Sequence, residues 1–124
     1  MNRRVRFVST VAVVLGLSTG AVACSSSGEA NNTYDRSIIL DVRTPEEFAA
    51  GHLDGAVLVD IKDPSFDEKL TALDPSVPYV VYCRSGNRSA QAVERMKAAG
   101  FTDLTDLGSL EHASSKTGIA IVQS

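Results

Sequence analysis

The stretch Tyr79–Met96, YVVYCRSGNRSAQAVERM, joins a strand-like run to a helix-like run through a short polar loop. The four residues before Cys83 are β-branched or aromatic, a composition typical of a buried strand. From Ser89 to Ala99 the apolar residues share one helical face, and Gly100 supplies a stop. We therefore predict a strand, a tight loop and a helix, with Cys83 at the carboxyl end of the strand.

Apolar and helical runs alternate through the rest of the chain from residue 36. The further strand-like runs are Ser37–Val42, Ala56–Ile61, Phe101–Leu107 and Ile119–Val122, and the further helical runs are Pro45–Ala50 and Ser65–Leu73. Strands that alternate with helices and are apolar along most of their length favour a parallel sheet covered on both faces. We therefore predict an α/β fold with a small parallel sheet flanked by helices. Ligands of such folds bind at the carboxyl ends of the strands, where Cys83 is placed.

The loop after Cys83 has the composition of an anion site. A tight loop that contains glycine can point successive N–H groups into one concavity, and the helix N-terminus adds partial positive charge. Arginine side chains carry permanent charge and forked donors that suit an oxyanion. We therefore expect Cys83 to be largely thiolate, and hence nucleophilic, at neutral pH. The predicted substrate- or anion-binding residues are Arg84, Ser85, Gly86, Asn87 and Arg88.

Other kinds of cysteine chemistry fit the sequence less well. A Cys–His hydrolase needs an imidazole beside the sulfur, and His52 and His112 lie in segments where we expect structural roles. A metal site needs more ligands at regular spacing, and a thioredoxin-like pair needs C-x-x-C, which is absent. The alternative of a buried apolar cysteine explains none of the Arg-Ser-Gly-Asn-Arg that follows Cys83.

Residues 1–23 have the parts of an export signal, with three arginines, an apolar stretch and then small residues. The apolar stretch Phe7–Leu17 is shorter than the roughly 20 residues of a membrane-spanning helix, which favours a cleaved signal peptide. The following Ala21–Cys24, AVAC, resembles the lipobox of bacterial lipoproteins, in which the cysteine is acylated. Ala21 departs from that pattern, which usually has a large aliphatic residue there. Ordinary secretory cleavage after Ala23 is the alternative.

Export and lipidation would leave a short anchored domain. Residues 24–35 are mostly small and polar, so we expect a flexible tether between a lipid on Cys24 and a domain of residues 36–124. Without residues 1–23, nine basic residues face fifteen acidic ones, which argues against a nucleic-acid partner. Cys83 would then be the single thiol, without a disulfide partner. We expect a monomer in the cell envelope, held on the extracytoplasmic side of a membrane.

Two segments resemble the signature regions of rhodanese-type sulfurtransferases, in that family's order and spacing. They are Leu40–Asp60, LDVRTPEEFAAGHLDGAVLVD, and Val81–Phe101, VYCRSGNRSAQAVERMKAAGF, and the resemblance extends from about Ile38 to about Leu110. It implies a rhodanese fold in which Cys83 carries a persulfide. The cysteine would take a sulfane sulfur from thiosulfate or a similar donor and pass it to cyanide or a thiol acceptor. We expect neither a metal nor an organic cofactor.

The resemblance also assigns supporting positions. Asp41 and Arg43 match the family's D-V-R, and we expect them to form a polar network that supports the loop, with a solvated pair at the strand end as the alternative. Glu47 and His52 match positions that look structural in the family. We expect His52 to satisfy a hydrogen bond at a helix end.

Loop length separates the activities known for this superfamily. Related phosphatases and arsenate reductases have five residues between the cysteine and the arginine, whereas four separate Cys83 from Arg88, which favours sulfur transfer.

The family's leading strand and helix are missing, and Gly108, Ser109 and Leu110 stand where a G-G-…-W segment is frequent. The chain thus resembles the short periplasmic rhodaneses of the phage-shock protein E type. The alternative to an exported thiosulfate sulfurtransferase is a non-catalytic rhodanese-like binding or sulfur-sensing module.

Overall fold

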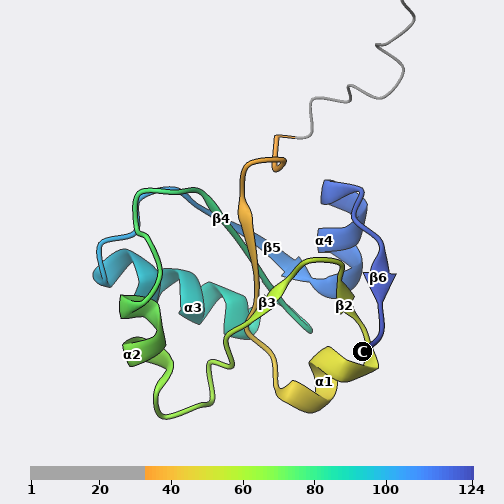
Figure 1. Cartoon of the computed structure of the whole chain (residues 1–124), viewed down its shortest axis with the longest axis horizontal. Helices are drawn as coiled ribbons and strands as arrows, with labels where there is room; N and C mark the ends of the chain where they lie inside the picture. Colours follow the sequence, from red (N-terminus) through yellow and green to blue (C-terminus); the bar gives the residue numbers. More distant parts are fainter. Residues whose placement is uncertain (1–32) are drawn as a thin grey trace, which may run out of the picture.

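A four-stranded parallel sheet lies at the centre of the part that the computed structural model describes, residues 33–124 (Figure 1). Across the sheet the strands are β3 (Val57–Leu58), β1 (Ile38–Asp41), β4 (Tyr79–Cys83) and β5 (Leu104–Ser109). An antiparallel ribbon pairs β2 (His52–Leu53) with β6 (Ile121–Val122). The helices are α1 (Pro45–Ala50), α2 (Phe66–Thr71), α3 (Asn87–Ala98) and α4 (Leu110–Thr117). None of the helices in this part is long and apolar enough to cross a membrane.

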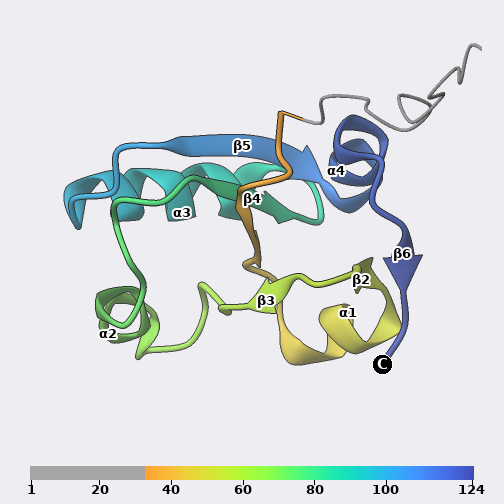
Figure 2. The ribbon, with the colours of Figure 1, turned by 45° about the horizontal axis from the view of Figure 1, so that its top comes forward.

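Strand β4 is the most buried element, because it has a neighbour on each side and helices on both faces. All five of its residues are buried. One core cluster contains Val81 with Phe66 of α2 and Met96 of α3, and a second contains Val80 with Leu110 of α4. Figure 2 shows where these three helices lie relative to β4. The predicted α/β class, with a parallel sheet covered on both faces, is therefore confirmed.

The observed element bounds differ from the predicted ones at several places, among them β5, which runs over Leu104–Ser109 where Phe101–Leu107 was expected. Helix α3 begins at Asn87, two residues earlier than predicted, so Arg88 belongs to the helix and not to the loop. The expected strand Ala56–Ile61 pairs only over Val57–Leu58, although the N–H of Ile61 still donates to the carbonyl of Val42 (3.2 Å). Helix α4 and strand β2 were not predicted. The predicted signal peptide, the lipid site Cys24 and residues 24–32 of the predicted tether lie outside the described residues.

A β-bulge shapes the carboxyl end of β5. Val81 is paired with Asp106 and the next residue of β4 with Gly108, so Leu107 is the extra residue. Gly108 has a φ of 70°, which favours glycine, and its N–H donates to the Asp106 carboxylate (2.9 Å). After the bulge, Ser109 lies opposite Cys83 and its side chain caps α4. The first turn of α4 is thereby brought to the edge of the sheet where β4 ends.

Candidate active site

The sulfur of Cys83 lies inside the turn that leads from β4 to α3. The residue is fully buried, and the N–H of Gly86 donates to Sγ over 2.9 Å. Gly86 has a φ of 100°, a conformation that other residues rarely adopt, and it is the N-cap of α3. The side chains of Arg84, Ser85 and Asn87 are exposed. The predicted loop residues therefore surround the sulfur mainly through their backbone, as an anion-binding turn does.

Hydrogen bonds to the sulfur favour its ionised form. Burial raises the pKa of the Cys83 thiol, but hydrogen bonds with the Ser89 hydroxyl and with the N–H groups of Ser89, Gly86 and Ser85 outweigh it, so the pKa is lowered overall. This direction agrees with the expected thiolate. Its main cause is a set of neutral donors, whereas the sequence had pointed equally to the neighbouring arginines.

Ser89 contacts the sulfur, and the sequence prediction missed it. Its Oγ lies 3.5 Å from Sγ and also donates to the carbonyl of Gly86 (3.1 Å). A hydroxyl has one proton, so in the protonated state the thiol donates to Ser89 while Ser89 donates to Gly86. When the thiol ionises, the hydroxyl can turn its proton to the sulfur. The sequence did carry one signal for Ser89: it is the first residue of the predicted helix and lies at helical spacing from the apolar residues of that helix's buried face.

Arg88 is held by a carboxylate of α1. Its Nη1 and Nη2 donate to Oε2 and Oε1 of Glu47 over 2.7 and 2.8 Å. Thr44 N also donates to Glu47, whose own N–H donates to Thr44 Oγ1 in a capping box. The hydrogen bonds from Arg88 and Thr44, in that order of importance and against the effect of burial, lower the pKa of Glu47 to about 2. Glu47 thus joins α1 to α3, and the predicted anion-binding role of Arg88 stays a prediction.

Asp41 and Arg43 form a buried network at the end of β1, not a solvated pair. Arg43 Nε and Nη2 donate to the Asp41 carboxylate at 2.9 and 2.6 Å, and Nη2 also donates to the carbonyl of Gly51 (2.6 Å). Tyr82 donates to Asp41 (2.8 Å) and accepts from the N–H of Leu53 (3.0 Å). Burial raises the pKa of Tyr82, so its hydroxyl keeps the proton that it donates. The network reaches Cys83 through the adjacent Tyr82 and does not touch the loop directly.

Both histidines are held by backbone carbonyls. His52 Nδ1 lies 2.8 Å from the carbonyl of Phe48, and its ring stacks on that of Phe48 at 3.7 Å. His112 Nδ1 lies 2.7 Å from the carbonyl of Leu107. His52 therefore satisfies a hydrogen bond at the end of α1, as predicted.

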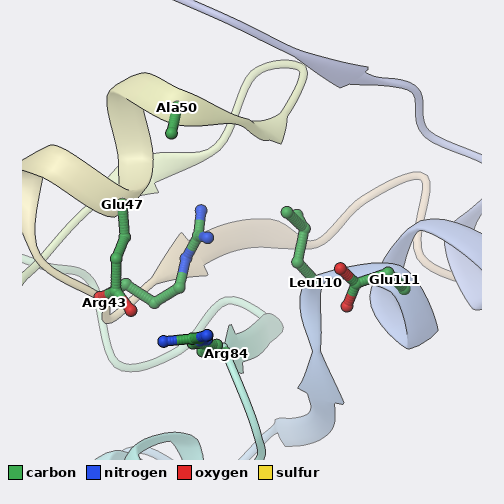
Figure 3. Close-up of a pocket in the computed structure, with 6 residues that line it drawn as sticks. All are labelled: Arg43, Glu47, Ala50, Arg84, Leu110 and Glu111. Carbon is green, nitrogen blue, oxygen red and sulfur yellow. The ribbon is translucent and has the colours of Figure 1, made fainter.

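A cavity of about 200 Å³ opens at the carboxyl end of the sheet (Figure 3). It is smaller than the roughly 300 Å³ at which pockets for drug-sized ligands begin, so it suits a small ligand. Cys83 does not reach its wall, but the next residue does. The lining residues are Arg43, Glu47, Ala50, Arg84, Leu110 and Glu111.

Comparison with known proteins gives consistent matches. The family model of the rhodanese-like domain matches residues 26–112. Thiosulfate sulfurtransferase 16, chloroplastic, of Arabidopsis thaliana is 38% identical over 90 residues, which cover 64% of this chain and 75% of the relative. Thiosulfate sulfurtransferase PspE of Escherichia coli is 31% identical over 72 residues, which cover 58% and 69%. The probable adenylyltransferase/sulfurtransferase MoeZ of Mycobacterium tuberculosis is 39% identical over 69 residues, 56% of this chain, but the match spans only 18% of that protein.

Solved structures agree with these sequence matches. A rhodanese with anions from Escherichia coli superimposes with a TM-score of 0.60 and 28% identity, over 71% of this chain and 99% of that chain. A rhodanese-related protein from Thermoplasma volcanium gives a TM-score of 0.63 and 28% identity, over 76% and 91% of the two chains.

The Tyr82 hydroxyl can be tested by its removal. Tyr82→Phe leaves the buried Leu53 N–H and one Asp41 oxygen short of a partner, so we expect the free energy of unfolding to fall by about 1–3 kcal/mol, measured by urea denaturation. Tyr79→Phe is the control, because its hydroxyl donates to the carbonyl of Asp74 in a less buried place (2.8 Å). Equal losses in the two variants would contradict a special role for the network.

Ser89→Ala tests how the thiolate is stabilised. The variant loses the hydroxyl that can donate to the sulfur, so the Cys83 thiol should titrate at higher pH than in the wild type. The measurement is the ultraviolet absorbance of the thiolate against pH, as a difference from Cys83→Ser, which removes the contribution of Cys24. Ser85→Ala keeps its backbone N–H and should titrate as the wild type does. If the thiol of Ser89→Ala titrated at the same pH as that of the wild type, the N–H groups alone would account for the lowered pKa of Cys83.

Proposed function

Because the chain belongs to the rhodanese-like domain family, we propose that it is a sulfurtransferase that carries sulfur on Cys83. The donor is thiosulfate or a similar sulfane compound, and the acceptor is cyanide or a thiol. The observation that carries the proposal is the turn around Sγ, whose N–H groups and hydroxyl lower the thiol pKa. Relatives named thiosulfate sulfurtransferase support the same reaction class.

In the first half of the proposed reaction the Cys83 thiolate attacks the outer sulfur of thiosulfate. The S–S bond of thiosulfate breaks, its electron pair leaves with sulfite, and Cys83 becomes a persulfide. In the second half the acceptor attacks the outer sulfur of the persulfide, and the Cys83 thiolate leaves with the bonding pair. Because Cys83 is anionic before and after each half, the same N–H groups stabilise both of its forms.

Arg84 is the cation that an incoming donor meets in this proposal. It follows Cys83 directly, lines the cavity and has an exposed side chain, whereas Arg88 is paired with Glu47. A guanidinium can hold the sulfonate end of thiosulfate through two parallel hydrogen bonds. Since Sγ is fully buried, the turn 84–86 has to move for the sulfur atoms to meet.

That burial favours the alternative, a non-catalytic rhodanese-like binding or sulfur-sensing module. In such a module Cys83 would hold a sulfur atom without passing it on. The lowered thiol pKa supports the enzyme instead, because a thiolate of lower pKa is the better leaving group when the persulfide passes its outer sulfur on. Turnover is the measurement that separates the two.

Turnover with thiosulfate and cyanide should produce thiocyanate, and Cys83 should gain the mass of one sulfur atom when cyanide is omitted. Cys83→Ser should abolish both signals, because a serine hydroxyl is neither ionised at neutral pH nor able to form a persulfide. Cys24→Ser is the matched control and should keep full turnover. A mass gain without thiocyanate would favour the binding module. The absence of both signals would overturn sulfur transfer.

We also propose export and lipid anchoring, from the sequence of residues outside the described part. Residues 1–23 would be cleaved and Cys24 acylated, which places the domain on the extracytoplasmic side of a membrane. Metabolic labelling with a fatty acid in the native host should mark the wild type and Cys83→Ala but not Cys24→Ala. Equal labelling of all three would rule out Cys24 as the lipid site.

A further inference from the structure

Two opposite charges without partners face the cavity at the carboxyl end of the sheet (Figure 3). One is the guanidinium of Arg84, and the other is the carboxylate of Glu111 in the first turn of α4. Within residues 33–124 neither side chain has a hydrogen bond or an ion pair. The other charged side chains of the wall, Arg43 and Glu47, are each paired with a neighbour. Among residues 33–124, the charged side chains of the cavity wall that are left without an ion pair are therefore one cation and one anion.

The sulfur donor accounts for only one of these charges. Thiosulfate is a dianion, so Arg84 attracts it while Glu111 repels it. A carboxylate on the wall attracts a substrate that carries a positive group, and in a two-step transfer the remaining substrate is the acceptor. We propose that the acceptor is a small thiol with both a carboxylate and an ammonium group, an amino-acid thiol, bound by Arg84 and Glu111 respectively. This inference rests on the sulfurtransferase function proposed above.

The size and apolar lining of the cavity fit the same class of molecule. The volume of about 200 Å³ lies below the roughly 300 Å³ at which pockets for drug-sized ligands begin, so a ligand as small as an amino-acid thiol suits it. Ala50 and Leu110 supply apolar wall between the charged groups, where the carbon atoms of the ligand can lie. The two charges then orient the ligand from its two ends.

The transfer needs no additional reactant. The thiol of the acceptor loses its proton to solvent, and its sulfur attacks the outer sulfur of the Cys83 persulfide. The bond between that sulfur and Sγ breaks, and Cys83 leaves as the thiolate with the electron pair. The product is the persulfide of the amino-acid thiol. The acceptor sulfur is oxidised as far as the Cys83 sulfur is reduced, so no external oxidant or reductant is needed. Sulfite has left before this step, so Arg84 can hold the carboxylate of the acceptor.

The experiment measures the second half-reaction alone, with full-length protein first converted to the persulfide by thiosulfate. The acceptors are L-cysteine, 3-mercaptopropionate, which lacks the ammonium group, and cysteamine, which lacks the carboxylate. For Glu111→Gln we expect kcat/KM with cysteine and cysteamine to fall about two- to fivefold, the range of an exposed ion pair, without a fall for 3-mercaptopropionate. Comparing variant with wild type for each thiol cancels the intrinsic reactivities of the thiols.

Arg84→Gln should show the complementary pattern, with losses for cysteine and 3-mercaptopropionate but not for cysteamine. Glu68→Gln, an exposed carboxylate on α2 away from the cavity, is the matched control and should behave as the wild type does. Equal effects of Glu111→Gln on all three thiols, or no effect on any, would overturn the inference. Cyanide, which carries neither group, tests the underlying reaction separately: no transfer to cyanide or to any of the three thiols would overturn the proposed function and this inference together.

Discussion

The buried carboxylate of Asp41 is the constraint on which the carboxyl end of the sheet depends. A carboxylate without solvent is costly unless several donors surround it, and here its donors come from different elements. Arg43 approaches from the turn after β1 and also binds the end of α1, while Tyr82 approaches from β4 and also binds β2. To satisfy one charge, the chain has to bring the ends of β1 and β4 and the β2–β6 ribbon together. The position of the residue after Tyr82, Cys83, follows from that geometry.

The sulfur itself is treated differently from Asp41, because it has to react. A thiolate paired tightly with a guanidinium would have a very low pKa, and nucleophilicity falls as thiol pKa falls. In this fold Arg88 is occupied by Glu47, and the sulfur receives neutral N–H groups and the Ser89 hydroxyl. These neutral donors favour the thiolate by hydrogen bonds, without a positive charge that would cancel the charge of the sulfur. The Glu47–Arg88 pair joins α1 to α3, and the charge that Arg88 brings near the sulfur is shared with a carboxylate.

The sequence was informative where local signals decide the structure. The bounds of α1 were predicted at Pro45–Ala50, because proline, first-turn acids and Gly51 mark both ends locally. Strand β2 could not be predicted, since two residues become a strand only by pairing with β6, far away in the chain. Helix α4 contains two serines and weak propensity, yet Leu110, Ala113 and Thr117 are buried at helical spacing. The role of Ser89 was missed because it depends on where α3 begins, which the turn at Gly86 sets.

The bulge in β5 connects these observations to substrate choice. It lies where the sequence departs from the usual family pattern, and it brings the start of α4, with Glu111, to the wall beside Arg84. In the proposed reaction the turn after β4 binds the donor, and this turn is needed for every step that forms the persulfide. The acceptor is bound by α4 as well, and α4 supplies no hydrogen bond to the sulfur. Since the two elements are separate, acceptor preference can change through β5 and α4 while the chemistry at Cys83 stays the same.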